Sequence, residues 1–126
     1  MLYRFKDSQP LENLQPVISG EDLMALFPAV RAVRIGEPVA HYLLNIIRAT
    51  REYPTMRLGA SPRAAIWLIR SSQAHAVLSG RDYVVPGDVK VLAVACLAHR
   101  LVTEGGMHQA ASTVRDLIET IPSPRP

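Results

Sequence analysis

One short run constrains this chain more than any other, the residues Gly59-Ala60-Ser61-Pro62-Arg63-Ala64, which open an apolar stretch reaching about Leu78. Ser61 is a residue type that caps a helix by accepting a hydrogen bond from a free N–H of the first turn. Pro62 then stands at the first helical position, where its missing N–H costs nothing. Small and apolar residues follow at spacings of three and four, namely Ala65, Leu68, Ile69, Ser72 and Ala76. This pattern predicts a helix over 62–78 with one buried face.

Arg63 is the unusual residue of this helix start. The helix macrodipole disfavours a cation in the first turn by about 0.3–1 kcal/mol, whereas the free N–H groups there suit an anion. A guanidinium at this position, with Arg57 six residues upstream, is a candidate phosphate contact. The alternative is a solvated arginine on an exposed first turn, and local physics alone favours that alternative.

Four more helices are expected from capping residues, prolines and apolar spacing. Glycines and prolines mark where they end. These four helices are in addition to the one over 62–78. They run from a capping box at Ser19 to Ala32, from Gly36 to just before Pro54, from Pro86 through Arg100, and from Ala110 to Ile121. The segments Val33–Ile35 and Tyr83–Val85 are short extended pieces that can pair, and Tyr53–Leu58 is predicted to be a loop. The predicted fold class is therefore all-α, about five helices with at most a minimal two-stranded contact.

The composition fits one globular domain. The chain has 126 residues, of which 48% are hydrophobic and 20% charged, so it can bury a core without disulfides or metals. No apolar run approaches the roughly 18 residues of a membrane span. A lone cysteine, Cys96, excludes an internal disulfide and indicates a reducing, cytoplasmic location. Cys96 falls on the apolar face of its helix, which predicts an inert thiol.

The net charge of +3 comes mainly from arginine, since only Lys6 and Lys90 are lysines. A basic chain raises nucleic acid or nucleotide phosphates as partners. The arginines are spread over every predicted helix rather than clustered on one, which makes nucleic-acid binding an unfavoured prediction. A stand-alone basic module that binds nucleic acid, and an interaction domain for a protein partner, remain the two rival hypotheses.

The search for catalytic chemistry is mostly negative. The sequence does not contain the Gly-Lys-Ser/Thr signature of a phosphate-binding loop. The four histidines lack metal-ligand spacing, so no metal site is predicted. No serine or cysteine has a local histidine and acid signature, and Trp67 is expected to pack rather than to stack on bases. The chain alone is therefore not expected to be an enzyme.

The run from Gly59 to Val102 resembles the C-terminal helical lid of MoxR-type AAA+ ATPases. The similarity includes the opening GASPRA, the turn GRDYV, the P-x-D-V helix start and the closing HRL. Upstream, Pro10–Ser19 is similar to the junction between ATPase core and lid in this family. The resemblance covers about residues 10–122.

The resemblance implies a role for Arg63 that local physics does not favour by itself. In the family, the arginine of this motif is the sensor-two residue, which reaches the γ-phosphate of ATP; Gly59, Ser61 and Pro62 are its supporting motif residues. ATP would then be the cofactor, with Mg²⁺ supplied by the ATPase core. The implied partners are that core, neighbouring AAA+ subunits in a hexamer, and a client protein that the sequence does not identify. Arg57 and Arg100 have no role implied by the resemblance.

Two features depart from the family pattern. The chain has no Walker A loop, Walker B acid or arginine finger, so it is expected to be a lid fragment whose parent hydrolyses ATP. Val85 precedes Pro86 where such sequences often have a capping Ser or Thr, which predicts a helix start weaker by about 1 kcal/mol. The expected organisation is a linker or core–lid junction over 1–18, a lid domain over 19–122 and a disordered tail over 123–126, since its prolines cannot continue a helix.

Overall fold

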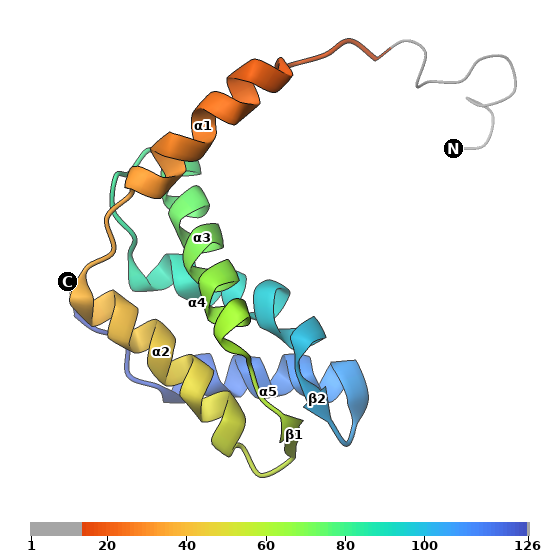
Figure 1. The fold of residues 1–126 in the computed structure, drawn as a ribbon. Coiled ribbons are helices and arrows are strands. Elements are labelled where there is room, and N and C mark those ends of the chain that lie inside the picture. Colours follow the sequence, from red (N-terminus) through yellow and green to blue (C-terminus); the bar gives the residue numbers. More distant parts are fainter. Residues whose placement is uncertain (1–13, 126) are drawn as a thin grey trace, which may run out of the picture.

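The computed structural model describes residues 14–125, so most of the predicted linker over 1–18 lies outside the described residues. It contains five α-helices and one two-stranded antiparallel sheet, which confirms the all-α prediction (Figure 1). The elements in chain order are α1 (Gly20–Ala32), α2 (Glu37–Glu52), β1 (Met56–Leu58), α3 (Pro62–Leu78), α4 (Pro86–Leu97), a 3₁₀ turn (Ala98–Arg100), β2 (Val102–Thr103) and α5 (Gly106–Thr120). None of the described helices combines the length and apolar character needed to cross a bilayer.

Capping contacts between residues three apart set the starts of two helices, α1 and α4. The Asp22 N–H donates to Ser19 Oγ over 3.0 Å and the Ser19 N–H donates to Asp22 Oδ2 over 3.3 Å, which completes the predicted capping box. Val85 has no side-chain acceptor, as expected, but its own N–H donates to Asp88 Oδ2 over 2.8 Å. The start of α4 therefore keeps one arm of a capping box.

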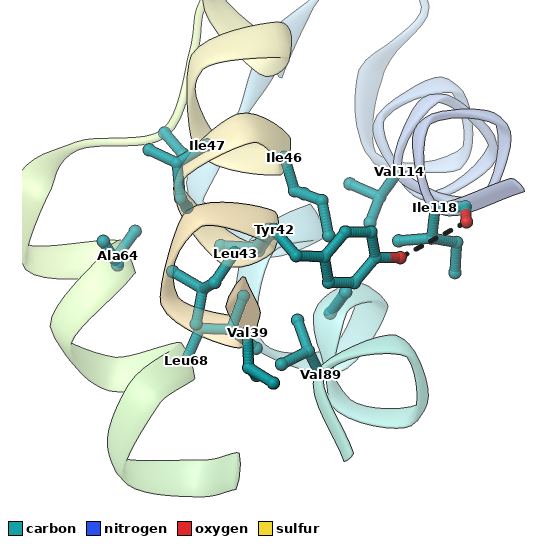
Figure 2. Packing of buried hydrophobic residues seen from close by; sticks show 14 of the residues in the cluster. Val39, Tyr42, Leu43, Ile46, Ile47, Ala64, Leu68, Val89, Val114 and Ile118 are labelled. Atoms are coloured by element: carbon teal, nitrogen blue, oxygen red, sulfur yellow. Dashed lines mark hydrogen bonds between the residues drawn. The ribbon is translucent and has the colours of Figure 1, made fainter. Parts of the chain in front are cut away.

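The core lies between α2, α3, α4 and α5. The inner face of α2 carries Tyr42, Leu43, Ile46 and Ile47, each at most 3% exposed. Figure 2 shows these side chains facing Leu68 of α3, Val89 of α4, and Val114 and Ile118 of α5. The Tyr42 hydroxyl also donates a hydrogen bond to the Ile118 carbonyl oxygen over 3.4 Å. These residues recur every three or four positions, as expected for the inner face of a helix.

The sheet was not predicted. Residues 53–58 were expected to form a loop, but Met56–Leu58 pairs with Val102–Thr103. The expected contact between Val33–Ile35 and Tyr83–Val85 exists as a single parallel bridge from Arg34 to Tyr83. Strands of two or three residues carry no alternation that a sequence pattern can detect, so their pairing depends on the helices that bring them together.

The last helix begins a full turn before the predicted Ala110. Gly105 precedes it, and the Gly105 N–H donates to Gln109 Oε1 over 2.6 Å. Thr103 Oγ1 also donates to the Gly106 carbonyl over 2.8 Å. These side chains satisfy backbone groups around the two glycines, so the helix starts at Gly106. Residues 122–125 form no helix.

Helix α1 differs from the other helices because it has no buried residue. It lies against α3 and extends from one end of the molecule toward the N-terminus (Figure 1). Its apolar stripe remains open, with Leu23 49%, Leu26 45% and Phe27 48% exposed. Helix α1 ends at Ala32 as predicted, and α3 covers its apolar face only in part.

Candidate functional site

The predicted site lies at the N-terminus of α3. Ser61 has extended backbone angles, and its Oγ accepts from the Ala64 N–H over 3.2 Å, so it is the expected N-cap. Pro62 is the first helical residue and Arg63 the second. Arg63 is exposed and forms no ion pair with any residue that the structure describes. The guanidinium is therefore free to contact a partner of opposite charge.

A hollow of about 390 Å³ opens beside this helix start. Its lining combines the turn before α3 with two arginines from distant parts of the chain. The lining residues are Arg51, Leu58, Gly59, Ala60, Ser61 and Arg100. None of these is acidic, and the Arg100 guanidinium lies over the half-exposed ring of Trp67, 6.0 Å from its centre. Pro62 has no N–H group, and Ser61 accepts from the N–H groups of Ala64 and Ala65. The guanidinium groups are therefore the main donors that make the region suited to an oxyanion.

Gly59 is required here by a close approach of backbone. A Cβ at this position would lie 2.6 Å from Arg51 Cγ, 2.7 Å from Arg51 Cα and 2.8 Å from Arg51 N. No side chain fits between the turn and the end of α2 at these distances. The glycine of the predicted motif therefore allows the turn to rest directly on α2.

Arg57 and Arg63 are six residues apart in the sequence, but the structure gives them different surroundings. Arg57 lies on β1, where its Nη2 is 3.5 Å from Glu104 Oε1, and it is not among the residues that line the hollow. Arg51 and Arg100 do line it, although no pattern in the sequence indicated a role for either. Arg51 lies in the last turn of α2 and Arg100 ends the 3₁₀ turn, so only the folded chain brings them to α3. Trp67 was expected to pack, but it is 52% exposed.

A second polar cluster surrounds Asp88, which is 1% exposed. Arg81 donates to both carboxylate oxygens, over 2.6 and 2.8 Å, and His75 Nδ1 lies 2.7 Å from Oδ1. Burial raises the pKa of Asp88, but hydrogen bonds from Arg81, the Val85 N–H and His75 outweigh burial and lower the pKa to about 2. The same contact with Asp88 raises the pKa of Arg81. Every oxygen of this carboxylate is used internally, so the cluster joins α3 to α4.

The part of the chain that the structure describes contains no set of side chains arranged to bind a metal ion. Within residues 14–125, no group of three or more His, Cys, Asp or Glu side chains could hold a metal ion. Cys96 is partly buried against the core.

Comparison with protein families finds that residues 48–121 match the model described as the AAA lid domain. The chain is 37% identical over 121 residues to an uncharacterized protein, YeaC, of Bacillus subtilis, covering 93% of this chain and 38% of that protein. It is 29% identical over 111 residues to the chaperone MoxR1 of Mycobacterium tuberculosis, covering 81% of this chain and 29% of that protein. It is also 39% identical over 71 residues to the protein MoxR of Methylorubrum extorquens, covering 52% and 21% of the two chains.

A solved structure of a protein from Cytophaga hutchinsonii, assigned as an ATPase, superposes with a TM-score of 0.74 at 30% sequence identity. The match covers 95% of this chain and 39% of that one. The chain thus spans less than two fifths of the length of each of these relatives. The matched family model covers more than half of the chain, the relatives include MoxR proteins, and the helices agree with a solved structure. The chain therefore belongs to the AAA lid domain family, as a lid of the MoxR-type AAA+ ATPases.

Proposed function

We propose that this lid closes over ATP held by an ATPase core, and that Arg63 is its sensor-two arginine, contacting the γ-phosphate. The observation that carries the proposal is the exposed guanidinium at the second residue of α3, which has no acidic partner among the described residues. A cation in a first turn is unfavourable for the isolated helix. A charge-assisted contact with phosphate would compensate for that cost when nucleotide is bound.

The residues around Arg63 fit a phosphate group. Arg51 and Arg100 line the adjoining hollow and no acidic side chain of the described chain does, so the local field favours an anion. ATP would be bound mainly by the core, which would also supply Mg²⁺. The lid residues would orient the terminal phosphate and exclude water as the lid closes.

The open apolar stripe of α1 supports the presence of a covering partner. Three large side chains of one helix, Leu23, Leu26 and Phe27, are each almost half exposed, and contiguous exposed apolar surface marks an interaction site. The relatives carry more than half of their length beyond the matched region. We assign the ATPase core as the partner on this stripe, within a hexamer that remodels client proteins in the cytoplasm.

The test uses a protein in which this lid is joined to an ATPase core. Arg63→Ala should lower kcat for ATP hydrolysis by at least about tenfold, because a preformed charge facing the reacting phosphate is lost. Arg115→Ala is the matched control, since Arg115 is an exposed arginine on α5 with no ion pair among the described residues. Normal hydrolysis by the Arg63→Ala protein would refute the sensor assignment, and equal losses in both variants would show a nonspecific charge effect.

A further inference from the structure

The turn before Arg63 is held by two consecutive side chains at the end of α2. Thr50 Oγ1 accepts a hydrogen bond from the Ala60 N–H over 2.9 Å and donates to the Ile47 carbonyl over 2.7 Å. Arg51 Nε donates to the Ala60 carbonyl over 2.9 Å. Both backbone polar groups of Ala60 are therefore bonded to α2.

Burial makes these bonds important for the geometry of the turn. Thr50 and Ala60 are both 0% exposed, so water cannot replace a lost partner without opening the structure. Gly59 adds a steric contact, because its Cα lies too close to Arg51 for any Cβ. Two hydrogen bonds and one close backbone approach thus fix this single point of the turn against α2.

The fixed point lies three residues before Arg63, and little freedom remains between them. Ser61 is locked as the N-cap by its bond to the Ala64 N–H, and the ring of Pro62 sets φ at the first helical position. The position of the Arg63 backbone relative to α2 is therefore set at Ala60. A displacement of about 1 Å at a phosphate contact is enough to reduce catalysis strongly.

We propose that Thr50 and Arg51 are positioning residues for Arg63: by holding Ala60 from both sides, they aim the sensor guanidinium at the phosphate. This inference rests on the proposed function of Arg63. Thr50 makes no contact with nucleotide in this scheme and acts only through the turn. Arg51 also lines the hollow, so Thr50 is the cleaner of the two residues to change.

The first experiment measures amide hydrogen exchange by NMR on the 126-residue chain itself. Thr50→Val preserves side-chain shape but removes the acceptor, so exchange at the Ala60 N–H should accelerate by about tenfold, with a smaller increase at Ala64. Thr50→Ser keeps the hydroxyl and should restore protection. Thr113→Val is the matched control, because Thr113 is 2% exposed on α5 and distant in sequence from the turn; it should leave Ala60 protected.

Arg51→Lys provides a second variant that does not alter the core, because Arg51 is exposed. It keeps the charge but loses the planar Nε–H donor, so it should also accelerate exchange at Ala60 and Ala64. Unchanged protection at Ala60 in both Thr50→Val and Arg51→Lys, or no protection in the wild type, would overturn the inference.

The second experiment measures steady-state ATP hydrolysis with the lid joined to an ATPase core. Thr50→Val should lower kcat by about threefold to tenfold with KM for ATP nearly unchanged, and Thr50→Ser should recover it. If Arg63→Ala impairs hydrolysis and Thr50→Val does not, the positioning role is wrong while the proposed function stands. If Arg63→Ala has no effect, the proposed function itself fails, and with it the catalytic part of this inference.

Discussion

Replacing Asp88 by asparagine tests how much the buried ion cluster stabilises the fold. The Asp88 carboxylate accepts two hydrogen bonds from Arg81, one from the Val85 N–H at 2.8 Å, and lies 2.7 Å from His75 Nδ1. Asparagine has nearly the same volume, but its amide NH₂ would face donors where an oxygen accepted them. Arg81 would keep its charge in a half-buried place without a counter-charge.

The expected cost follows from the burial and the pKa. Removing one partner of a buried ion pair costs about 3–5 kcal/mol, which for a domain of this size corresponds to about 10–20 °C in Tm. The pKa of Asp88 gives a second way to gauge how much the ionised carboxylate stabilises the fold. It is lowered from 3.8 to about 2 in the folded protein, and this shift corresponds to about 2 kcal/mol in favour of folding when the carboxylate is ionised.

The sign of the pH dependence follows from the lowered pKa. Because the folded protein binds this proton less tightly than the unfolded chain, the stabilisation is complete above about pH 4 and is lost as the pH falls towards about pH 2. Urea denaturation followed by circular dichroism at several pH values measures both effects. The wild type should lose about 2 kcal/mol through Asp88 over that range, and Asp88→Asn should lack this component.

Asp82→Asn is the matched control. Asp82 pairs with Arg34 at 3.0 Å, but the two side chains are 77% and 74% exposed, so its loss should cost less than about 1 kcal/mol. If Asp88→Asn costs no more than Asp82→Asn at neutral pH, or keeps the acid dependence of the wild type, the reasoning about this cluster is refuted.

Three further predictions concern the site and the rival functions. In thermal melts, Arg63→Ala should leave the free energy of unfolding of the chain unchanged or slightly higher. Leu68 is 0% exposed, so Leu68→Ala should lower it by about 2–5 kcal/mol. Unfolding of the Arg63→Ala protein would show that this arginine is structural. The purified chain should not hydrolyse ATP and should bind it at about millimolar or weaker, since one arginine cannot supply the roughly 8 kcal/mol of micromolar binding; turnover by a contaminant-free sample would contradict the lid assignment. Binding to duplex DNA should be undetectable near physiological salt, and sequence-selective binding that survives about 200 mM salt would favour the nucleic-acid hypothesis.

The helices, apart from the start of the last one, and the position of Arg63 were predictable from local patterns in the sequence. Ser19, Ser61 and Pro62 start helices through contacts within three or four residues, and apolar spacing predicted the buried face of α3, where Leu68 and Ala76 are 0% exposed. Such signals are local, so they hold before the chain is packed. The same locality placed Arg63 in the first turn of α3 and associated it with Gly59, Ser61 and Pro62. Its contact with phosphate stays a prediction.

The contacts between those elements follow from how the chain packs in three dimensions. Asp88 meets His75 and Arg81 because α3 and α4 pack together, and Thr50 and Arg51 hold Ala60 because the turn folds back on α2. The pairing of β1 with β2 joins segments more than forty residues apart. These contacts depend on how helices cross and how closely backbones approach, and no short sequence pattern specifies either. For the same reason, it is the packing of the chain that leaves the apolar stripe of α1 about half exposed.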